Sequence, residues 1–192
     1  MDNYNFLLFD VETNGIGTFR PPTQTMTQIA FLKFNRDGTI LDTGSYVVRG
    51  ATELSDHPAV TISKERIKEE GIDVNLAINK LLNIIDENTV LVSHNYDFDS
   101  AIIDTALRKH GSQFPNIKYF CTMKASTNYC KLPKTGNSSY YPGYKYPKLI
   151  ELAEKLGIPM DPAKFHDALY DCIITKKCFL AGLNRGIFKR SN

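Results

Sequence analysis

The order of the periodic apolar segments is the feature of this chain that most constrains its fold. Three segments with the short apolar or alternating pattern of β-strands come first, and segments of helical period alternate with two further strands after them. The Asp37-Gly38 pair between the second and third strands is a hairpin signal, which predicts an antiparallel meander at the start of the sheet. The predicted strands are residues 5–11, 28–34, 40–48, 89–93 and 117–121.

Amphipathic helices fill the remainder of the pattern. In residues 73–86 the apolar side chains recur with a helical period and form one stripe. Gly157 follows another such segment and is expected to end it. The predicted helices are residues 63–70, 73–86, 97–110, 148–156 and 167–183. Strands followed by alternating strands and helices predict an α/β fold, with a mixed five-stranded sheet and helices on both faces.

The composition fits one globular domain. A chain of 192 residues, 42% hydrophobic and 23% charged, has the size and balance of a single domain, expected to cover residues 1–192. The net charge of +2 creates no overall field that would favour nucleic acid, a membrane or an acidic partner, so any basic surface must be local.

Sorting signals and membrane spans are not predicted. The first apolar stretch, residues 6–9, is too short for a signal peptide, and lysines interrupt the longer apolar segments before they reach a membrane-spanning length. We therefore expect a cytoplasmic or nuclear protein that is not secreted and does not contact a membrane. The cysteines lack a C-x-x-C spacing, which predicts free thiols and argues against a zinc site; they are Cys121, Cys130, Cys172 and Cys178.

Carboxylates stand at three predicted strand or helix ends. Asp10 and Glu12 lie two residues apart on the first strand, so both leave the same face of the sheet near its carboxyl end. Asp99 follows the strand at 89–93, and His166 and Asp171 stand at the start of the last helix. Each pattern alone also fits a helix cap or a solvated turn. Their apolar neighbours, however, predict partly buried carboxylates that need cations.

Oxygen ligands of this kind predict hard divalent ions. Several carboxylates can hold two Mg²⁺ or Mn²⁺ ions about 4 Å apart, an arrangement that suits phosphodiester cleavage. An imidazole whose pKa lies near neutrality can take the proton of an attacking water, and His166 is the residue predicted for that role.

The same residues resemble the motifs of the DnaQ-like 3′–5′ exonucleases of the DEDD superfamily, which have the ribonuclease H-like fold. The motif F-D-x-E-T is similar to residues 9–13, H-N-x-x-F-D to residues 94–99, and H-D-A-x-x-D to residues 166–171. Residues 148–158 also resemble the helix K-L-x-x-L-A-x-x-L-G-I of this family. The motifs occur in the family's order, and the resemblance spans residues 5–180.

This resemblance implies a metal-dependent 3′–5′ exonuclease that releases nucleoside 5′-monophosphates from single-stranded DNA or RNA. Asp10 would contact both ions, Glu12 and Asp171 would hold the ion on the nucleophile side, and Asp99 would support the second ion. The histidine subclass, DEDDh, is indicated because His166 stands five residues before Asp171. The tyrosine subclass has its Tyr where this chain has Asp167. The resemblance further implies contacts to the 3′-terminal nucleotide from Thr13, Asn14, Gly15, His94 and Asn95.

Two loops depart from the family pattern. The loop at 14–26, with Arg20, Pro21 and Pro22, is longer than the usual turn and leaves from the catalytic strand, so it is a candidate for lining the substrate groove. The loop at 129–148 interleaves tyrosines with lysines and contains no acidic residue. This composition fits either stacking and charge contacts with a single strand or a surface loop whose tyrosines pack on the body.

Other functions stay open at this point. A module of the same fold could bind nucleic acid without cleaving it or serve as a polymerase-associated subunit, although all five expected catalytic positions are filled. A polymerase partner or a homodimer is compatible with catalysis. The choice between DNA and RNA depends on contacts to the 2′-hydroxyl, which a sequence does not reveal.

Overall fold

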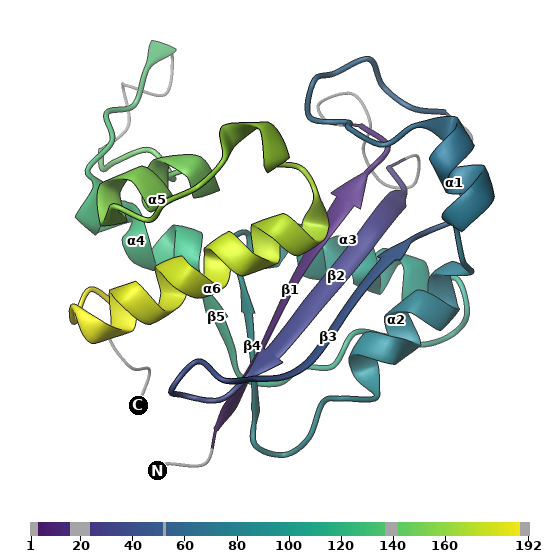
Figure 1. Ribbon diagram of the computed structural model, residues 1–192, viewed down its shortest axis with the longest axis horizontal. Coiled ribbons are helices and arrows are strands. Elements are labelled where there is room, and N and C mark those ends of the chain that lie inside the picture. Colours follow the sequence, from purple (N-terminus) through teal and green to yellow (C-terminus); the bar gives the residue numbers. More distant parts are fainter. Residues whose placement is uncertain (1–3, 16–23, 52, 137–141, 189–192) are drawn as a thin grey trace.

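A mixed five-stranded sheet forms the centre of the molecule (Figure 1). The computed structural model describes residues 4–15, 24–51, 53–136 and 142–188. The strand order is β3-β2-β1-β4-β5, with β2 antiparallel to β1 and β3, and with β4 and β5 parallel to β1. The predicted meander and mixed sheet are therefore confirmed. The strands are β1 (Asn5–Thr13), β2 (Met26–Phe34), β3 (Ile40–Val47), β4 (Thr89–Ser93) and β5 (Tyr119–Cys121).

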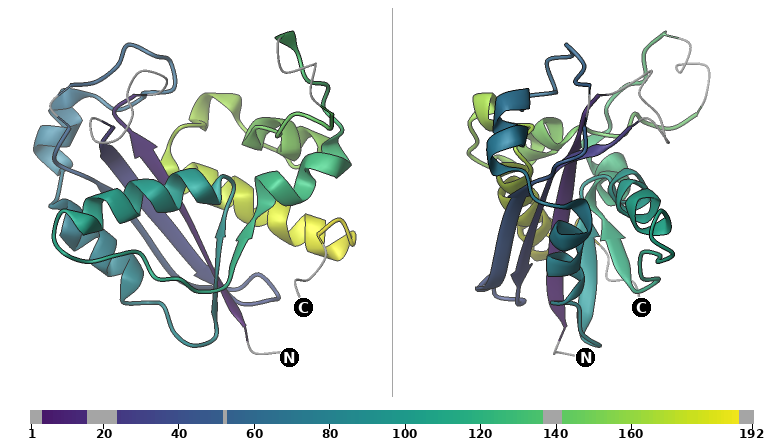
Figure 2. Two further views of the ribbon diagram at one scale, coloured as in Figure 1. Left: turned by 180° about the vertical axis from the view of Figure 1, so that it is seen from behind. Right: turned by 90° about the vertical axis from the view of Figure 1, so that its right-hand side faces the viewer.

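Helices cover both faces of this sheet, as Figure 2 shows from two further sides. They are α1 (Lys64–Glu70), α2 (Val74–Leu82), α3 (Tyr96–Arg108), α4 (Thr122–Cys130), α5 (Leu149–Leu156) and α6 (Ala168–Asn184), with a 3₁₀ turn η2 (Pro162–Lys164) before α6. No helix in the described part of the chain is long and apolar enough to cross a bilayer. All four cysteines are buried and free, as expected from their spacing.

Alternate side chains of β1 contact different helices, because they lie on opposite faces of the sheet. Leu7 and Phe9 belong to a buried cluster with residues of α2 and α3. Leu8 points the other way, into a cluster that includes Cys172 and Phe179 of α6. Because side chains alternate along a strand, Asp10 lies on the α6 face of the sheet. The pattern of the buried strand therefore decides which helix the carboxylates of β1 meet.

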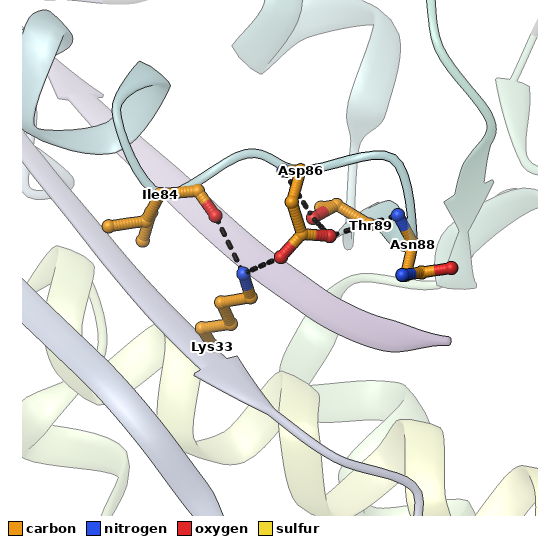
Figure 3. Close-up of polar contacts among 5 residues, drawn as sticks. All are labelled: Lys33, Ile84, Asp86, Asn88 and Thr89. Carbon is orange, nitrogen blue, oxygen red and sulfur yellow. Dashed lines mark hydrogen bonds and ion pairs between the residues drawn. The ribbon is translucent and has the colours of Figure 1, made fainter. Parts of the chain in front are cut away.

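The helix predicted at 73–86 is confirmed for residues 74–82 and is wrong over its last four residues. Helix α2 ends at Leu82, and the following turn is held by Lys33 of β2, whose Nζ donates to the carbonyl of Ile84 at 2.7 Å and pairs with Asp86 Oδ2 at 2.5 Å (Figure 3). Asp86 Oδ1 in turn accepts hydrogen bonds from Thr89 and Asn88. A tertiary contact with a largely buried lysine thus overrides the local helical period.

Helix α4 was not predicted. Its sequence is rich in Thr, Ser and Asn, which are weak helix formers because their side chains compete for backbone hydrogen bonds. Here the hydroxyls of Ser126 and Thr127 donate one turn back, to the carbonyls of Thr122 and Met123. The helix also buries Cys130 in a third cluster with α5 and α6, so tertiary packing stabilises it.

Candidate active site

Asp10 and Glu12 occupy the carboxyl end of β1. The register with β2 places Asp10 opposite Ala30 and Glu12 opposite Gln28. Both carboxylates are half-buried on the face that α6 covers. Gln28 is a residue that no motif indicated: its Oε1 accepts a hydrogen bond from the amide of Ala168 at 3.3 Å and so ties the start of α6 to this edge of the sheet.

Asp99 reaches the same edge from α3. The register pairs Leu8 of β1 with Val92 of β4, so Ser93 at the end of β4 lies beside the part of β1 that carries Asp10. The hydroxyl of Ser93 donates to Asp99 Oδ2, and the Asp99 side chain is only 3% exposed. Because the connection between β4 and α3 is short, the second motif, residues 94–99, lies next to the first, residues 9–13.

His166 and Asp171 complete the group from the start of α6. Asp167 is the N-cap of this helix, accepting from the amide of Tyr170, and Asp171 follows in the first turn. Ligand atoms of Glu12, His166 and Asp171 all lie within 4.8 Å of one another. The backbone of His166 has a φ of +67°, in the left-handed region. The three predicted motifs therefore meet at one edge of the sheet.

Like charges and burial raise the pKa of every carboxyl in the group. Burial and the neighbouring Asp99 and Asp171 hold the pKa of Asp10 well above its usual range. Burial raises the pKa of Glu12 to about 8, with the charge of Asp171 adding to the effect. Burial also raises the pKa of both Asp99 and Asp171 to about 7. In the absence of a cation, the cluster favours protonation.

The donor set fits a divalent cation. Asp171 Oδ1 is buried and has no hydrogen-bond partner within the described ranges, which leaves this oxygen available to a ligand. Its second oxygen accepts a long hydrogen bond, 3.4 Å, from the amide of His166. Carboxylate oxygens that repel one another and lack donors are the ligands preferred by Mg²⁺ and Mn²⁺.

His166 itself is exposed and has a lowered pKa. Partial desolvation is the main cause, and electrostatic repulsion from the His57 and Lys148 side chains adds to it. His57 comes from a segment that no sequence motif covers, whereas Lys148 opens the family-like helix at 148–158. A lowered pKa keeps the imidazole of His166 neutral at physiological pH, the form that can accept a proton.

His94 lies beside the site with both ring nitrogens engaged. Nε2 lies 3.0 Å from the carbonyl of Pro147, which can only accept, so Nε2 carries the proton. Nδ1 then accepts from the hydroxyl of Thr122, also at 3.0 Å. Burial lowers the pKa of His94 to about 4, so the ring is neutral. Asn95 is the N-cap of α3, and its amide donates to Ser93 Oγ.

Residues 13–15 follow the first motif in a tightly bonded turn. Thr13 Oγ1 donates to the carbonyl of Gly15, and Asn14 Oδ1 accepts from the amide of Thr25 at 2.8 Å. Gln24 Nε2 donates to the same Gly15 carbonyl. Thr13, Asn14 and Gly15 are all buried in these contacts, and the Asn14 amide and carbonyl also hydrogen-bond, to Thr25 and Ser55. Residues 16–23 of the loop at 14–26, including Arg20, Pro21 and Pro22, lie outside the described residues.

The loop at 129–148 is partly charge-compensated. Lys145 pairs with Glu151 at 2.5 Å, and Tyr129 donates to the carbonyl of Lys155. Tyr144 and Tyr146 are 40% and 57% exposed. The tyrosines of this loop at positions 140 and 141 lie outside the described residues. Tyr129 belongs to α4 rather than to the loop; it is 39% exposed and contacts α5 through its hydroxyl.

Comparison with known proteins agrees with this site. Residues 7–179 match the ribonuclease T family model, described as exonuclease. Ribonuclease T of Actinobacillus pleuropneumoniae serotype 5b is 22% identical over 216 residues, covering 95% of this chain and 89% of its own. A PolC-type DNA polymerase III of Thermotoga petrophila is 24% identical over 180 residues, covering 93% of this chain. The chain spans only 12% of that polymerase.

Among solved structures, the nuclease domain of 3'hExo, a DEDDh family member bound to rAMP, shares the fold with a TM-score of 0.74 and 19% identity. The similarity covers 100% of this chain and 98% of that domain. The chain belongs to the exonuclease family, and the resemblance to its DEDDh members is confirmed. The ribonuclease H-like fold expected from the motifs is likewise confirmed.

Proposed function

We propose that the chain is a 3′–5′ exonuclease that shortens single-stranded nucleic acid and releases nucleoside 5′-monophosphates. The observation that carries this proposal is the meeting of Glu12, His166 and Asp171 within 4.8 Å, beside the half-buried carboxylate of Asp10 and the buried one of Asp99. The direction of cleavage is supported by two structural neighbours, one described as a 3'-exonuclease and the other as a DEDDh family member bound to rAMP.

The carboxylates would hold two Mg²⁺ or Mn²⁺ ions. We expect Asp10 to contact both, Glu12 and Asp171 to hold the one on the nucleophile side, and Asp99 to support the other. When bound, the ions would lower the pKa of a water molecule and neutralise charge on the leaving oxygen. Ser93 orients Asp99 through its hydroxyl, and Gln28 fixes the start of α6 so that Asp171 faces the sheet.

His166 would act as the general base. Its ring is exposed at the edge of the cluster and neutral at physiological pH, so it can accept the proton of the attacking water. The electrons of the water oxygen then form the new P–O bond while the bond to the 3′-oxygen of the preceding nucleotide breaks. His94 lacks a free ring nitrogen for this role, because Thr122 and Pro147 occupy both.

A single strand would run past the turn at 13–15 and the loop that precedes α5. Thr13, Asn14 and Gly15 would lie along the 3′-terminal nucleotide, and Asn95 would stand beside it. The exposed ring of Tyr146 is available for stacking, and Lys148 supplies a positive charge near His166. A polymerase partner is a further part of the proposal, because a PolC-type polymerase is among the relatives.

The test is cleavage of matched 5′-labelled single-stranded DNA and RNA by the full chain with Mg²⁺. We expect a ladder of 3′-shortened products on at least one polymer, no activity in Asp10→Ala, and a loss of roughly 10²- to 10⁴-fold in His166→Ala. Asp42→Ala, an exposed aspartate on β3, is the matched control and should keep full activity. Binding of both polymers without shortening would instead indicate a non-catalytic binding module.

A further inference from the structure

We propose that Thr61 is a positioning residue for His166; this inference depends on the proposed role of His166 as general base. The hydroxyl of Thr61 donates to the backbone carbonyl of His166 at 2.7 Å, across 105 positions of the chain. Thr61 lies in the segment between β3 and α1, which belongs to none of the three motifs. Figure 1 shows this segment reaching the edge of the sheet where β1 ends.

The backbone of His166 is in a conformation that needs support. Its φ of +67° lies in the left-handed region, which residues with a Cβ seldom adopt. Among the described residues other than glycine, Lys131 also has a positive φ, but it caps the end of α4, where the left-handed conformation is common. His166 instead lies in the turn that joins η2 to the N-cap of α6, a turn position whose positive φ favours glycine or asparagine over other residues.

Two hydrogen bonds flank this strained residue. On one side its amide donates to Asp171 Oδ2 over 3.4 Å, which is a weak contact. On the other side its carbonyl accepts from Thr61 at 2.7 Å, which is the stronger of the two. The Thr61 hydroxyl therefore fixes the peptide plane of His166, and the direction of the imidazole follows from that plane.

The segment that carries Thr61 is itself well anchored. Ile62 is buried in a small cluster with Val47 and Ile67. Earlier in the same segment, the amide of Ser55 donates to the carbonyl of Asn14 at 2.8 Å. Asn14, which follows the first motif directly, also donates from its side chain to the carbonyl of residue 53 at 3.2 Å. The segment thus links the first motif to the third, and Thr61 is its contact with the third.

The kinetic test uses two substitutions at Thr61 and one matched control. Thr61→Val keeps the shape of the side chain and removes the donor, whereas Thr61→Ser keeps the donor. Thr43→Val removes a comparable bond, from Thr43 Oγ1 to the carbonyl of Phe31 at 3.1 Å, away from the carboxylates. We expect Thr61→Val to lower kcat about tenfold through misplacement of the base, with KM within twofold. Thr61→Ser and Thr43→Val should match the parent chain.

A double substitution decides whether Thr61 acts through His166. In the His166→Ala background, Thr61→Val should cause no further loss, because the group that it positions is absent. If Thr61→Val lowers the residual rate by the same factor as in the parent chain, Thr61 acts elsewhere and the proposal is wrong. As a control, the midpoint of thermal unfolding of each variant should lie close to that of the parent chain, which would show that all of them are folded.

A second readout does not depend on activity. A residue with positive φ gives a strong nuclear Overhauser effect between its own amide and α protons, so histidine-labelled metal-free protein reports the backbone of His166. We expect this signal in the parent chain and in Thr61→Ser, and its weakening in Thr61→Val. Absence of cleavage by the parent chain would refute the proposed function alone, while this signal still tests the role of Thr61. An unchanged signal in Thr61→Val would overturn the positioning role.

Discussion

Replacing Asp99 with asparagine should stabilise the metal-free protein at pH 8, although it removes a proposed ligand. The Asp99 side chain is 3% exposed, and burial raises its pKa from 3.8 to about 7. The folded state therefore holds this proton more tightly than the unfolded chain does. The resulting penalty on folding is absent below the unfolded pKa, grows as the pH rises, and is complete above the folded pKa.

The size of this penalty follows from the two pKa values. At about 1.36 kcal/mol per pH unit, the gap between 3.8 and about 7 corresponds to about 4 kcal/mol at pH 8. Asparagine keeps the shape of the side chain, and the Ser93 hydroxyl can still donate to its carbonyl oxygen. We expect the substitution to recover about 2 to 4 kcal/mol. For a chain of this length, that corresponds to a rise of roughly 4 to 16 °C in thermal midpoint.

The assay is thermal unfolding of the parent chain and Asp99→Asn in a chelator at pH 8 and pH 5, with exposed Asp42→Asn as the control. The advantage of Asp99→Asn should shrink by more than half at pH 5, where most of the penalty has disappeared. Added Mg²⁺ should raise the midpoint of the parent chain more than that of the variant. A metal-free variant that is no more stable than its parent at pH 8 would refute the argument that this cluster stores unfavourable charge.

Three further substitutions test other parts of the site. His57→Gln removes an imidazole whose electrostatic repulsion, second to burial, lowers the pKa of His166. The acid limb of the pH profile of kcat/KM should then move to higher pH, and a shift to lower pH would contradict this. His94→Phe leaves the Thr122 hydroxyl and the Pro147 carbonyl without their partner. The His94→Phe substitution should lower the free energy of unfolding by about 2 to 3 kcal/mol, measured by urea denaturation. Tyr146→Ala should raise KM for an oligonucleotide severalfold with kcat within twofold, whereas Tyr4→Ala should leave both unchanged, as steady-state kinetics would show.

The sheet and the carboxylate edge could be predicted because both depend on local patterns. The apolar alternation in β1 puts Leu8 and Asp10 on one face, and the strand predicted at 89–93 coincides with β4. Because acidic residues stand at the ends of these strands, the sequence also predicts the edge of the sheet where the motifs meet. Helix α4 could not be predicted in this way, because its Thr- and Ser-rich sequence favours no helix in isolation and Cys130 obtains its packing from α5 and α6.

Contacts between distant segments account for the rest of what sequence patterns could not reveal. Gln28 meets Ala168 across 140 positions, and Thr61 meets His166 across 105. Neither residue has a periodicity or spacing that distinguishes it from an ordinary polar residue of a strand or loop. Their roles become visible once α6 is placed over the sheet, because the placement of α6 decides which side chains reach its first turn.

His94 shows how a motif can indicate the correct location and leave the role open. The resemblance places this residue beside the 3′-terminal nucleotide, and the structure does bring it to the edge of the site. Its two hydrogen bonds, however, run to α4 and to the residue before Lys148. They hold the segment that carries Tyr146 against the end of β4. If Tyr146 contacts the substrate, His94 influences binding through the position of this segment, and its loss should lower stability and raise KM together.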